Sequence, residues 1–141
     1  MSDAETIPEG FERHDRRSPV TDPWEPIWRR LHGDVMVLGV RAAQAHCNSR
    51  GFVHGGLISA LSDNAMGLNC FRRLDGTVRL VTVNLSVDFL GSAQVGQWLE
   101  FDTAFVKPGG TLCFAQAFVT ADGQPCARAN AVFRVVRTAA A

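Results

Sequence analysis

The chain has 141 residues, which suits one domain and leaves no room for a comfortable second one. Hydrophobic residues make up 46% of it and charged residues 20%, and its 14 basic residues balance its 14 acidic ones. This is the composition of an ordinary globular protein, and the balanced charge argues against a nucleic-acid or a membrane-surface partner.

The N-terminus and the cysteines favour a cytoplasmic protein. The opening MSDAETIPEG lacks the basic and apolar regions of a signal peptide, and no apolar run approaches the length of a membrane span. The cysteines are far apart and form no C-x-x-C pair, so we expect free, mostly buried thiols rather than a disulfide framework or a zinc ribbon. They are Cys47, Cys70, Cys113 and Cys126.

The first part of the chain is predicted to hold a flexible lead-in, a short helix and a strand. Residues 1–20 are rich in charge and contain two prolines, which indicates a poorly ordered lead-in to a single domain over 21–137. Asp22 suits a helix N-cap and Gly33 a helix stop, so a helix of two or three turns is expected between them. Residues 34–46 alternate imperfectly and predict the first strand.

One long helix is predicted from Gly56 to about Phe71, because apolar residues recur there at helical spacing. The most regular strand follows at residues 81–89. Its alternation predicts that one face carries Val81, Val83, Leu85, Val87 and Phe89, and that the other carries Thr82, Asn84, Ser86 and Asp88.

Three further strands are predicted at residues 97–106, 111–120 and 125–136, joined by the turns KPGG and ADGQ. Short turns require antiparallel neighbours, so the economical fold is α+β, with one long helix packed on a curved antiparallel five-stranded sheet. Both faces of the later strands are apolar, which predicts that a partner subunit covers one of them.

Asp63 is the unusual residue of the long helix. Aspartate is a poor interior helix residue, and Asp63 is too far from the helix start to act as a cap. At that start, Gly55 and Gly56 leave backbone N–H groups free and let a ligand approach closely, where the helix dipole favours negative charge. Asn48 adds an amide donor and Thr82 a hydroxyl, so these residues together predict acyl transfer to water.

These residues resemble a known signature. The pattern N-x-x-G-x-x-H-G-G-x-x-x-x-L-x-D-x-A-x-G, with Asn48, His54, Gly55 and Asp63 at its polar positions, is similar to that of hotdog-fold acyl-CoA thioesterases of the phenylacetic-acid-degradation (PaaI-like) type. The order of the strands is similar too, so the resemblance covers about residues 20–137. It implies hydrolysis of an acyl-CoA thioester to a free acid and coenzyme A.

The resemblance also implies a role for each site residue. The Gly55 N–H and the Asn48 side chain would polarise the thioester carbonyl, and Asp63 would act as a general base or as a nucleophile. Thr82 would orient the water or the carboxylate, and His54 would shape the loop or contact the sulfur side of the substrate. In such enzymes the site forms between subunits, which implies a homodimer, often paired further into a dimer of dimers.

Substrate-binding residues are less specific in the sequence. Besides Gly56, we expect contacts to coenzyme A phosphates from one or more basic residues, namely Arg72, Arg73, Arg79 and Lys107. No metal or other cofactor is expected, because His46 and Cys47 are not part of a tetrahedral ligand set with sensible spacing.

Two other functions compete with the thioesterase. A hotdog hydratase would need a histidine paired with a carboxylate at a different spacing. A non-catalytic acyl-CoA-binding hotdog module is the alternative from another class, although known regulators of that kind carry an added DNA-binding segment.

Overall fold

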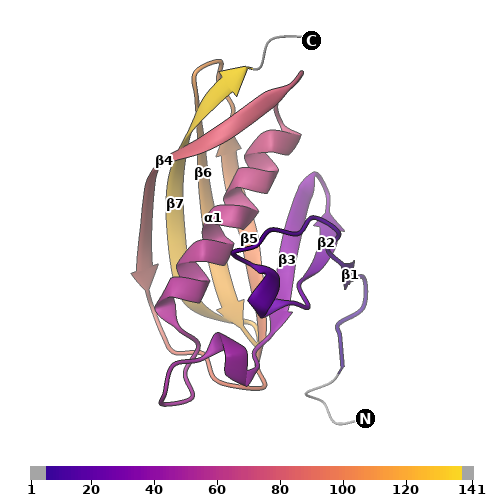
Figure 1. Cartoon of the computed structure of the whole chain (residues 1–141), viewed down its shortest axis with the longest axis vertical. Coiled ribbons are helices and arrows are strands. Elements are labelled where there is room, and N and C mark those ends of the chain that lie inside the picture. Colours follow the sequence, from indigo (N-terminus) through magenta and orange to yellow (C-terminus); the bar gives the residue numbers. More distant parts are fainter. Residues whose placement is uncertain (1–5, 138–141) are drawn as a thin grey trace.

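The computed structural model describes residues 6–137 of the chain. Within this range one long helix, α1 (Gly55–Arg72), lies across a sheet of seven antiparallel strands (Figure 1). The order across the sheet is β1-β2-β3-β5-β6-β7-β4, so β1 and β4 are its two edges. The strands are β1 (Glu12–Arg13), β2 (Trp28–His32), β3 (Val35–Arg41), β4 (Val78–Phe89), β5 (Trp98–Lys107), β6 (Leu112–Ala121) and β7 (Gln124–Arg137).

The predicted α+β class is confirmed, but the prediction of five strands is wrong. The sequence reading missed β1 and β2, which extend the sheet beyond β3. β1 lies within the expected lead-in of residues 1–20 and pairs with β2. Residues 1–5 lie outside the described residues, and the domain boundary near residue 20 stays a prediction.

The predicted helix between Asp22 and Gly33 is also wrong. Only the 3-10 helix η2 (Asp22–Trp24) forms, and β2 follows it. Pro26 has no backbone N–H for a continuing helix. Gly33, with φ of +61°, belongs to the short turn that joins β2 to β3 in a hairpin, a backbone conformation that glycine adopts readily.

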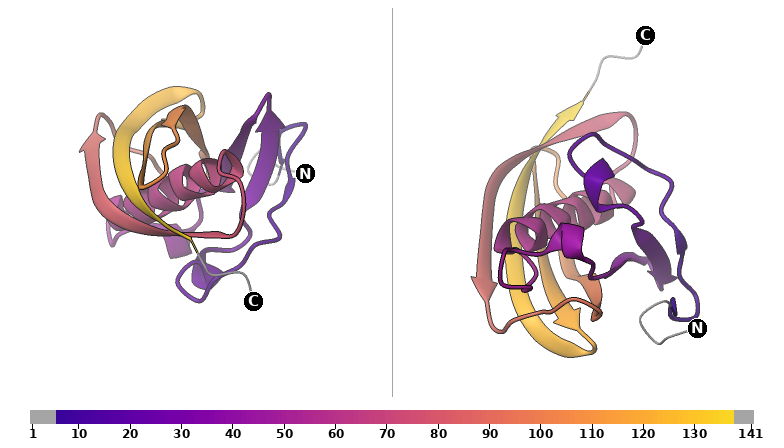
Figure 2. Two further views of the ribbon diagram at one scale, coloured as in Figure 1. Left: turned by 90° about the horizontal axis from the view of Figure 1, so that it is seen from above. Right: turned by 60° about the horizontal axis from the view of Figure 1, so that its bottom comes forward.

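The sheet curves around α1, as Figure 2 shows, and the strands beneath the helix carry small side chains. Paired alanines of β6 and β7 form the centre of this surface: Ala115 lies opposite Ala131 and Ala117 opposite Ala129. The helix packs on them with residues at helical spacing. Its buried positions are Leu57, Ile58, Leu61, Ser62, Ala65, Met66, Asn69 and Cys70.

One buried polar side chain fixes α1 against the sheet. Asn69 is only 2% exposed. Its Oδ1 accepts a hydrogen bond from the Met36 N–H at 2.8 Å, and its Nδ2 donates to Met36 O and to Thr103 Oγ1, both at 3.0 Å. Because Met36 belongs to β3 and Thr103 to β5, this side chain sets the position of the helix over two strands.

The alternation of side chains in strand β4 shifts by one residue part-way along the strand. Its register with β7 shifts between Thr82 and Asn84, so Val83 is an extra residue in the ladder. Thr82 before this bulge and Leu85 after it both lie on the α1 side of the strand. The predicted common face is therefore wrong, because Val81 and Val83 are 54% and 59% exposed while Leu85 packs against the core.

The outer face of the sheet carries exposed aromatic side chains. Phe105, Phe114 and Phe118 are 52%, 40% and 39% exposed. They belong to the paired strands β5 and β6 and lie on the side away from α1. This agrees with the prediction that both faces of the later strands are apolar.

The other expectations about the chain concern its thiols and membrane spans. All four cysteines are free thiols, and three of them are buried, as predicted. Within residues 6–137, no helix has the length and apolar character needed to cross a bilayer. The expected cytoplasmic location stays a prediction.

Candidate functional site

Asp63 lies on the outer side of α1, half-buried beside β4. The Thr82 hydroxyl donates a hydrogen bond to Asp63 Oδ1 at 2.8 Å. The other carboxylate oxygen, Oδ2, has no hydrogen-bond partner among the described residues. A carboxylate with one oxygen oriented by a hydroxyl and the other free is suited to accept a proton from water or to attack an acyl carbon.

Asn48 begins a tight loop that leads to α1. Its Oδ1 accepts hydrogen bonds from the backbone N–H groups of Arg50 and Phe52, at 2.9 and 3.2 Å. The Asn48 N–H in turn donates to Phe52 O at 2.8 Å, which closes the loop. Because both N–H donors converge on the amide oxygen, the amide NH₂ of Asn48 remains available to donate to a ligand.

His54 and the two glycines after it form the start of α1. His54 Nδ1 accepts a hydrogen bond from the Gly56 N–H at 2.8 Å and so caps the helix. A Cβ on Gly56 would come within 2.9 Å of this nitrogen, which explains the glycine there. The Gly55 N–H has no partner among residues 6–137, so the helix N-terminus offers a free donor.

Within one chain the donors and the carboxylate do not meet. Asp63 follows Gly55 by eight residues along α1. At the α-helical rise this separates them by roughly 12 Å. A thioester carbonyl bound to the Gly55 N–H of one chain is therefore out of reach of the Asp63 of the same chain.

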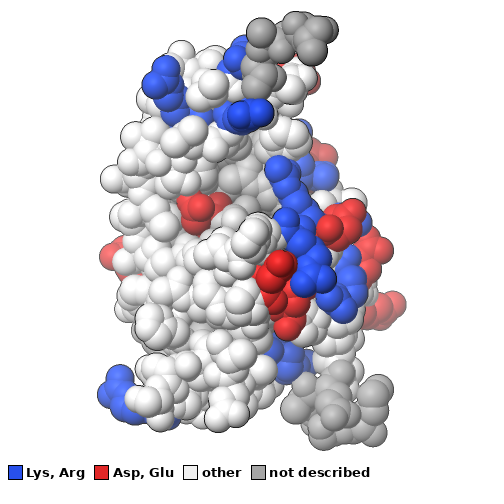
Figure 3. All heavy atoms as spheres, viewed as in Figure 1, with Lys and Arg blue, Asp and Glu red and all other residues white. Residues whose placement is uncertain are grey.

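A cavity of about 510 Å³ opens beside Asp63 and Thr82. Its lining is about half polar and half apolar, and the apolar part along α1 and the sheet includes Leu38, Gly67, Leu68, Phe71, Leu80 and Phe133. Figure 3 shows a hollow on this face, with acidic atoms on one side and basic atoms on the other. A cavity of this size is typical of a small-molecule site.

A model described as the thioesterase superfamily matches residues 50–127. The chain belongs to this superfamily. The matched range contains His54, Gly55, Asp63 and Thr82, whereas Asn48 lies just before it. Membership confirms the predicted class of enzyme, a thioester hydrolase, and the helix wrapped by a curved antiparallel sheet is the hotdog fold that the resemblance implied.

Two relatives with sequences similar to this chain are an esterase and an acyl-CoA thioesterase by name. "Putative esterase PA0474" of Pseudomonas aeruginosa is 36% identical over 130 residues, which are 92% of this chain and 97% of the relative. "Acyl-coenzyme A thioesterase 13" of the mouse is 28% identical over 89 residues. The latter match spans 62% of this chain and 61% of the mouse protein.

A solved thioester-binding relative has the same architecture. The protein smu.793 of Streptococcus mutans, whose crystal structure contains acetyl CoA, is 28% identical to this chain with a TM-score of 0.66. The match covers 72% of this chain and 82% of that protein.

The structure separates the four basic residues that were expected to contact coenzyme A. Arg79 lines the thioesterase cavity beside Asp63. Arg72, on the last turn of α1, lines a different hollow next to β1 and β2. Arg73 is the exposed C-cap of the helix, and Lys107 ends β5 at the hairpin to β6. They do not form one cluster.

His46 has a structural role in this thioesterase. Its Nδ1 accepts a hydrogen bond from the Ala43 N–H at 2.8 Å, and its Nε2 lies 2.9 Å from Trp24 O as the donor. Both ring nitrogens are thus engaged. Among the described residues, no group of three His, Cys, Asp or Glu side chains could hold a metal ion.

The sequence reading missed the segment 14–18 as part of the cavity wall. His14, Arg16, Arg17 and Ser18 all line the cavity. The short strand β1 precedes this segment and sets its path, but two residues are too few for an alternating pattern. The three consecutive charged residues at 15–17 were the only local signal that could have drawn attention to it.

Proposed function

We propose that this thioesterase hydrolyses acyl-CoA thioesters to a carboxylic acid and coenzyme A. The observation that carries the proposal is the Asp63 carboxylate, which accepts a hydrogen bond from Thr82 at a cavity with an apolar wall, in a chain of the thioesterase superfamily. The acyl-coenzyme A thioesterase among its relatives and the acetyl CoA in a similar structure support coenzyme A as the thiol. Assignment to the PaaI-like type stays a prediction.

The active site in this proposal lies between two copies of the chain. The donors at Gly55 and Asn48 and the acid at Asp63 are too far apart to act on one carbonyl within a single copy. Two copies related by a two-fold axis would exchange these halves and make two equal sites. Each site would use the donors of one copy and the carboxylate of the other.

Strand β4 is the edge through which such a dimer would form. Among residues 6–137 it pairs only with β7, so within this range the other edge of the 12-residue strand has unpaired backbone groups. A Cβ on Gly55 would lie 3.1 Å from the ring of Phe89, so the helix start of each copy is beside the end of its own β4. Antiparallel pairing of two β4 strands would bring that end to the beginning of the partner strand, next to Arg79 and the cavity.

The chemistry follows from this arrangement. The Gly55 N–H and the Asn48 NH₂ donate to the carbonyl oxygen and stabilise the negative charge that develops on it. Asp63 of the other copy takes a proton from water, whose oxygen attacks the carbonyl carbon, and the tetrahedral intermediate then expels the coenzyme A thiolate. In the alternative, an Asp63 oxygen attacks the carbonyl carbon and the coenzyme A thiolate leaves as the C–S bond breaks, and water then hydrolyses the mixed anhydride to release the acid and regenerate Asp63.

The remaining roles concern coenzyme A binding and the outer face of the sheet. Arg79 is placed to contact a coenzyme A phosphate because it borders the cavity, whereas Arg72, Arg73 and Lys107 would contact parts of coenzyme A further away. The exposed aromatic residues on the outer sheet face are suited to pair two dimers into a tetramer.

The direct test is thiol release from acyl-CoA esters by the wild type, Asp63→Asn and Asn48→Ala. Each single variant should lose most of its turnover, by roughly a hundredfold or more. Mixing the two inactive variants under conditions that exchange subunits should restore activity, because each mixed dimer has one site without either defect. With random exchange the recovery should approach about a quarter of the wild-type rate.

Two outcomes would contradict the proposal in different ways. If the mixture of folded dimers stays as inactive as its components, the site does not form between subunits. If wild type and Asp63→Asn show equal, feeble rates while both bind acyl-CoA, the protein is a binding module rather than a hydrolase.

A further inference from the structure

The cavity beside Asp63 continues well past the reacting groups. Its wall along α1 runs from Asp63 past Gly67 to Phe71. That is eight residues, or roughly 12 Å along the helix axis. Gly67 has no side chain and leaves the middle of this wall open. An acyl group with its thioester at Asp63 has an apolar path toward Phe71.

The far end of this path is basic. The Arg16 guanidinium lies over the ring of Phe71, 5.6 Å from its centroid. Within residues 6–137, Arg16 has no ion pair with a carboxylate. Its neighbour Arg17 differs, because it is paired with Asp22 at 3.1 Å. One cation at this end of the cavity is therefore not compensated by the protein.

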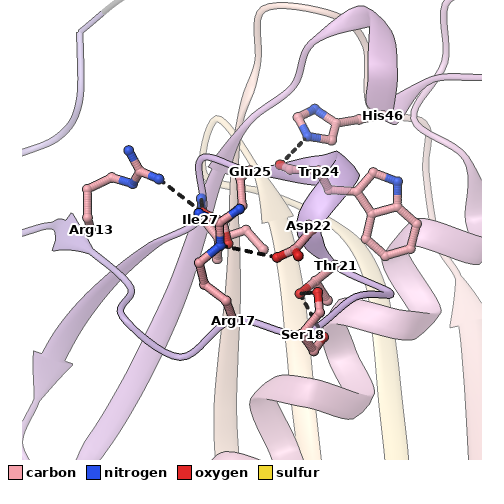
Figure 4. Close-up of polar contacts among 9 residues, drawn as sticks. All are labelled: Arg13, Arg17, Ser18, Thr21, Asp22, Trp24, Glu25, Ile27 and His46. Carbon is pink, nitrogen blue, oxygen red and sulfur yellow. Dashed lines mark hydrogen bonds and ion pairs between the residues drawn. The ribbon is translucent and has the colours of Figure 1, made fainter.

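The segment that carries Arg16 is held in place by polar contacts on both sides (Figure 4). Before it, Arg13 is paired with Glu25 at 3.2 Å. After it, the Ser18 and Thr21 hydroxyls lie 2.9 Å apart within hydrogen-bonding distance. The backbone N–H of Thr21 also donates to Ser18 O at 3.1 Å. The wall is thus formed before any ligand binds, which reduces the entropy cost of binding.

We propose that residues 14–18 close the far end of the acyl pocket and that Arg16 receives an anionic group there. The preferred substrates are then thioesters of acyl groups that end in a carboxylate. This inference rests on the proposed function, since it takes Asp63 as the position of the thioester. The apolar wall binds the methylene or aromatic body, and the guanidinium pairs with the distal carboxylate.

The experiment compares matched pairs of CoA thioesters that differ only by a terminal carboxylate, such as hexanoyl against adipoyl and octanoyl against suberoyl. The variants are Arg16→Gln and the control Arg128→Gln, whose arginine is paired with Asp88 outside the cavity. Arg16→Gln should lower kcat/KM for the carboxylated thioesters by roughly tenfold or more, because it removes a charge-assisted pair. Unsubstituted thioesters should change less than twofold, and Arg128→Gln should resemble the wild type.

A second measurement determines binding to the pocket separately from hydrolysis. Thioether analogues of CoA, with an S-alkyl chain or the same chain ending in a carboxylate, bind but cannot be hydrolysed. Calorimetry should show that the wild type prefers the carboxylated analogue and that Arg16→Gln loses this preference. Equal effects of Arg16→Gln on both members of each pair would overturn the assignment of Arg16, even if the enzyme hydrolyses both. Selective binding without turnover would instead contradict the proposed function and leave the pocket assignment supported.

Discussion

The loop at the start of α1 and the cavity beside Asp63 differ in how many of their polar atoms the chain itself occupies. In the loop, Asn48 Oδ1 accepts two backbone N–H groups and His54 Nδ1 accepts a third. At Asp63, the Thr82 hydroxyl is the only hydrogen-bond donor to the carboxylate among the described residues, and the second carboxylate oxygen faces a cavity that a ligand can enter.

The loop at the start of α1 has to keep one conformation, whereas the side chains of the cavity beside Asp63 can differ with the substrate. Donors stabilise an oxyanion only when they are held at the correct distance before the reaction begins, so their supports are backbone groups of the same loop. The cavity has to accept one acyl group and reject others, which is decided by the size and charge of a few side chains. Substitutions in the loop should therefore lower kcat for every substrate, whereas substitutions in the cavity should change kcat/KM for some acyl groups more than for others.

The largest effect is expected at Asn48, whose amide oxygen holds the loop and whose NH₂ group is proposed to donate to the substrate. Asn48→Ala removes the oxygen and the NH₂ group. Asn48→Asp keeps an oxygen for the Arg50 and Phe52 N–H groups but removes the NH₂ donor. Both should lower kcat by roughly a hundredfold or more. Only Asn48→Ala should also lower the free energy of unfolding, by about 1 kcal/mol, as measured by urea denaturation. An active Asn48→Asp enzyme would show that the amide donates nothing to the substrate.

A smaller loss is expected when Thr82 no longer orients Asp63. Thr82→Val keeps the shape but removes the hydrogen bond to Oδ1, which should lower kcat by roughly tenfold, the value of one hydrogen bond to a charged group. Thr82→Ser retains the hydroxyl and should remain within a few-fold of the wild type. If the serine and valine variants are equally impaired in steady-state assays, the methyl group rather than the hydroxyl matters.

Gly67→Ala should change which thioesters are used more than the overall activity. The added Cβ would lie 3.4 Å from the Phe133 ring, a distance that the helix can accommodate. The alanine should raise the free energy of unfolding by up to about 1 kcal/mol, because glycine is a poor helix former. It should also lower kcat/KM several-fold for bulky acyl groups and leave acetyl-CoA unchanged. A uniform loss across the acyl series would place the acyl group outside this cavity.

The smallest expected effect is the pH dependence of stability that His14, in the cavity wall, contributes. Burial, and next the nearby Arg29, lower the pKa of His14 below its ordinary value, against the opposing effect of Asp15 and Glu25. The unfolded chain therefore binds a proton on this histidine more readily than the folded chain. Its contribution to stability is present above about pH 6.5 and is lost as the pH decreases through the lower, folded-state pKa.

The variant His14→Gln tests this dependence, because glutamine does not titrate. Urea unfolding at pH 7.5 and pH 5.5 should show a smaller difference in the variant than in the wild type. The same difference in both proteins would mean that other groups account for the acid sensitivity.

Sequence reasoning was most successful where a local pattern has one physical explanation. The helix from Gly56 to Phe71 was expected from its apolar spacing, and α1 differs from it by one residue at each end. A hydroxyl at Thr82 was expected to orient the Asp63 carboxylate, and the two side chains are in contact. The first inference depends on periodicity that the sequence itself contains, and the second on the resemblance to the thioesterase signature; the catalytic role of Thr82 stays a prediction.

It failed where distant segments decide the outcome. Residues 28–32 have no strong alternation and become a strand because β3 pairs with them through the turn at Gly33. Arg16 reaches the cavity only because β1 and the contacts after it direct the chain along α1, and no local pattern encodes that path. The distance between Gly55 and Asp63 was available from the helix rise, but the sequence does not show how a second copy would bring them together.

The bulge at Val83 shifts the alternation of side chains along β4 by one residue. Upstream of it, the even-numbered residues of β4 lie toward the helix, and downstream the odd-numbered ones do. The extra residue lets both sets of side chains face α1. If Val83 took a regular place in the ladder instead, either Thr82 would turn away from Asp63 or Leu85 and Val87 would turn out of the core. Deleting this exposed valine would remove the bulge and leave Thr82, Asn84 and Leu85 in regular alternation, with Thr82 and Leu85 still on the helix side.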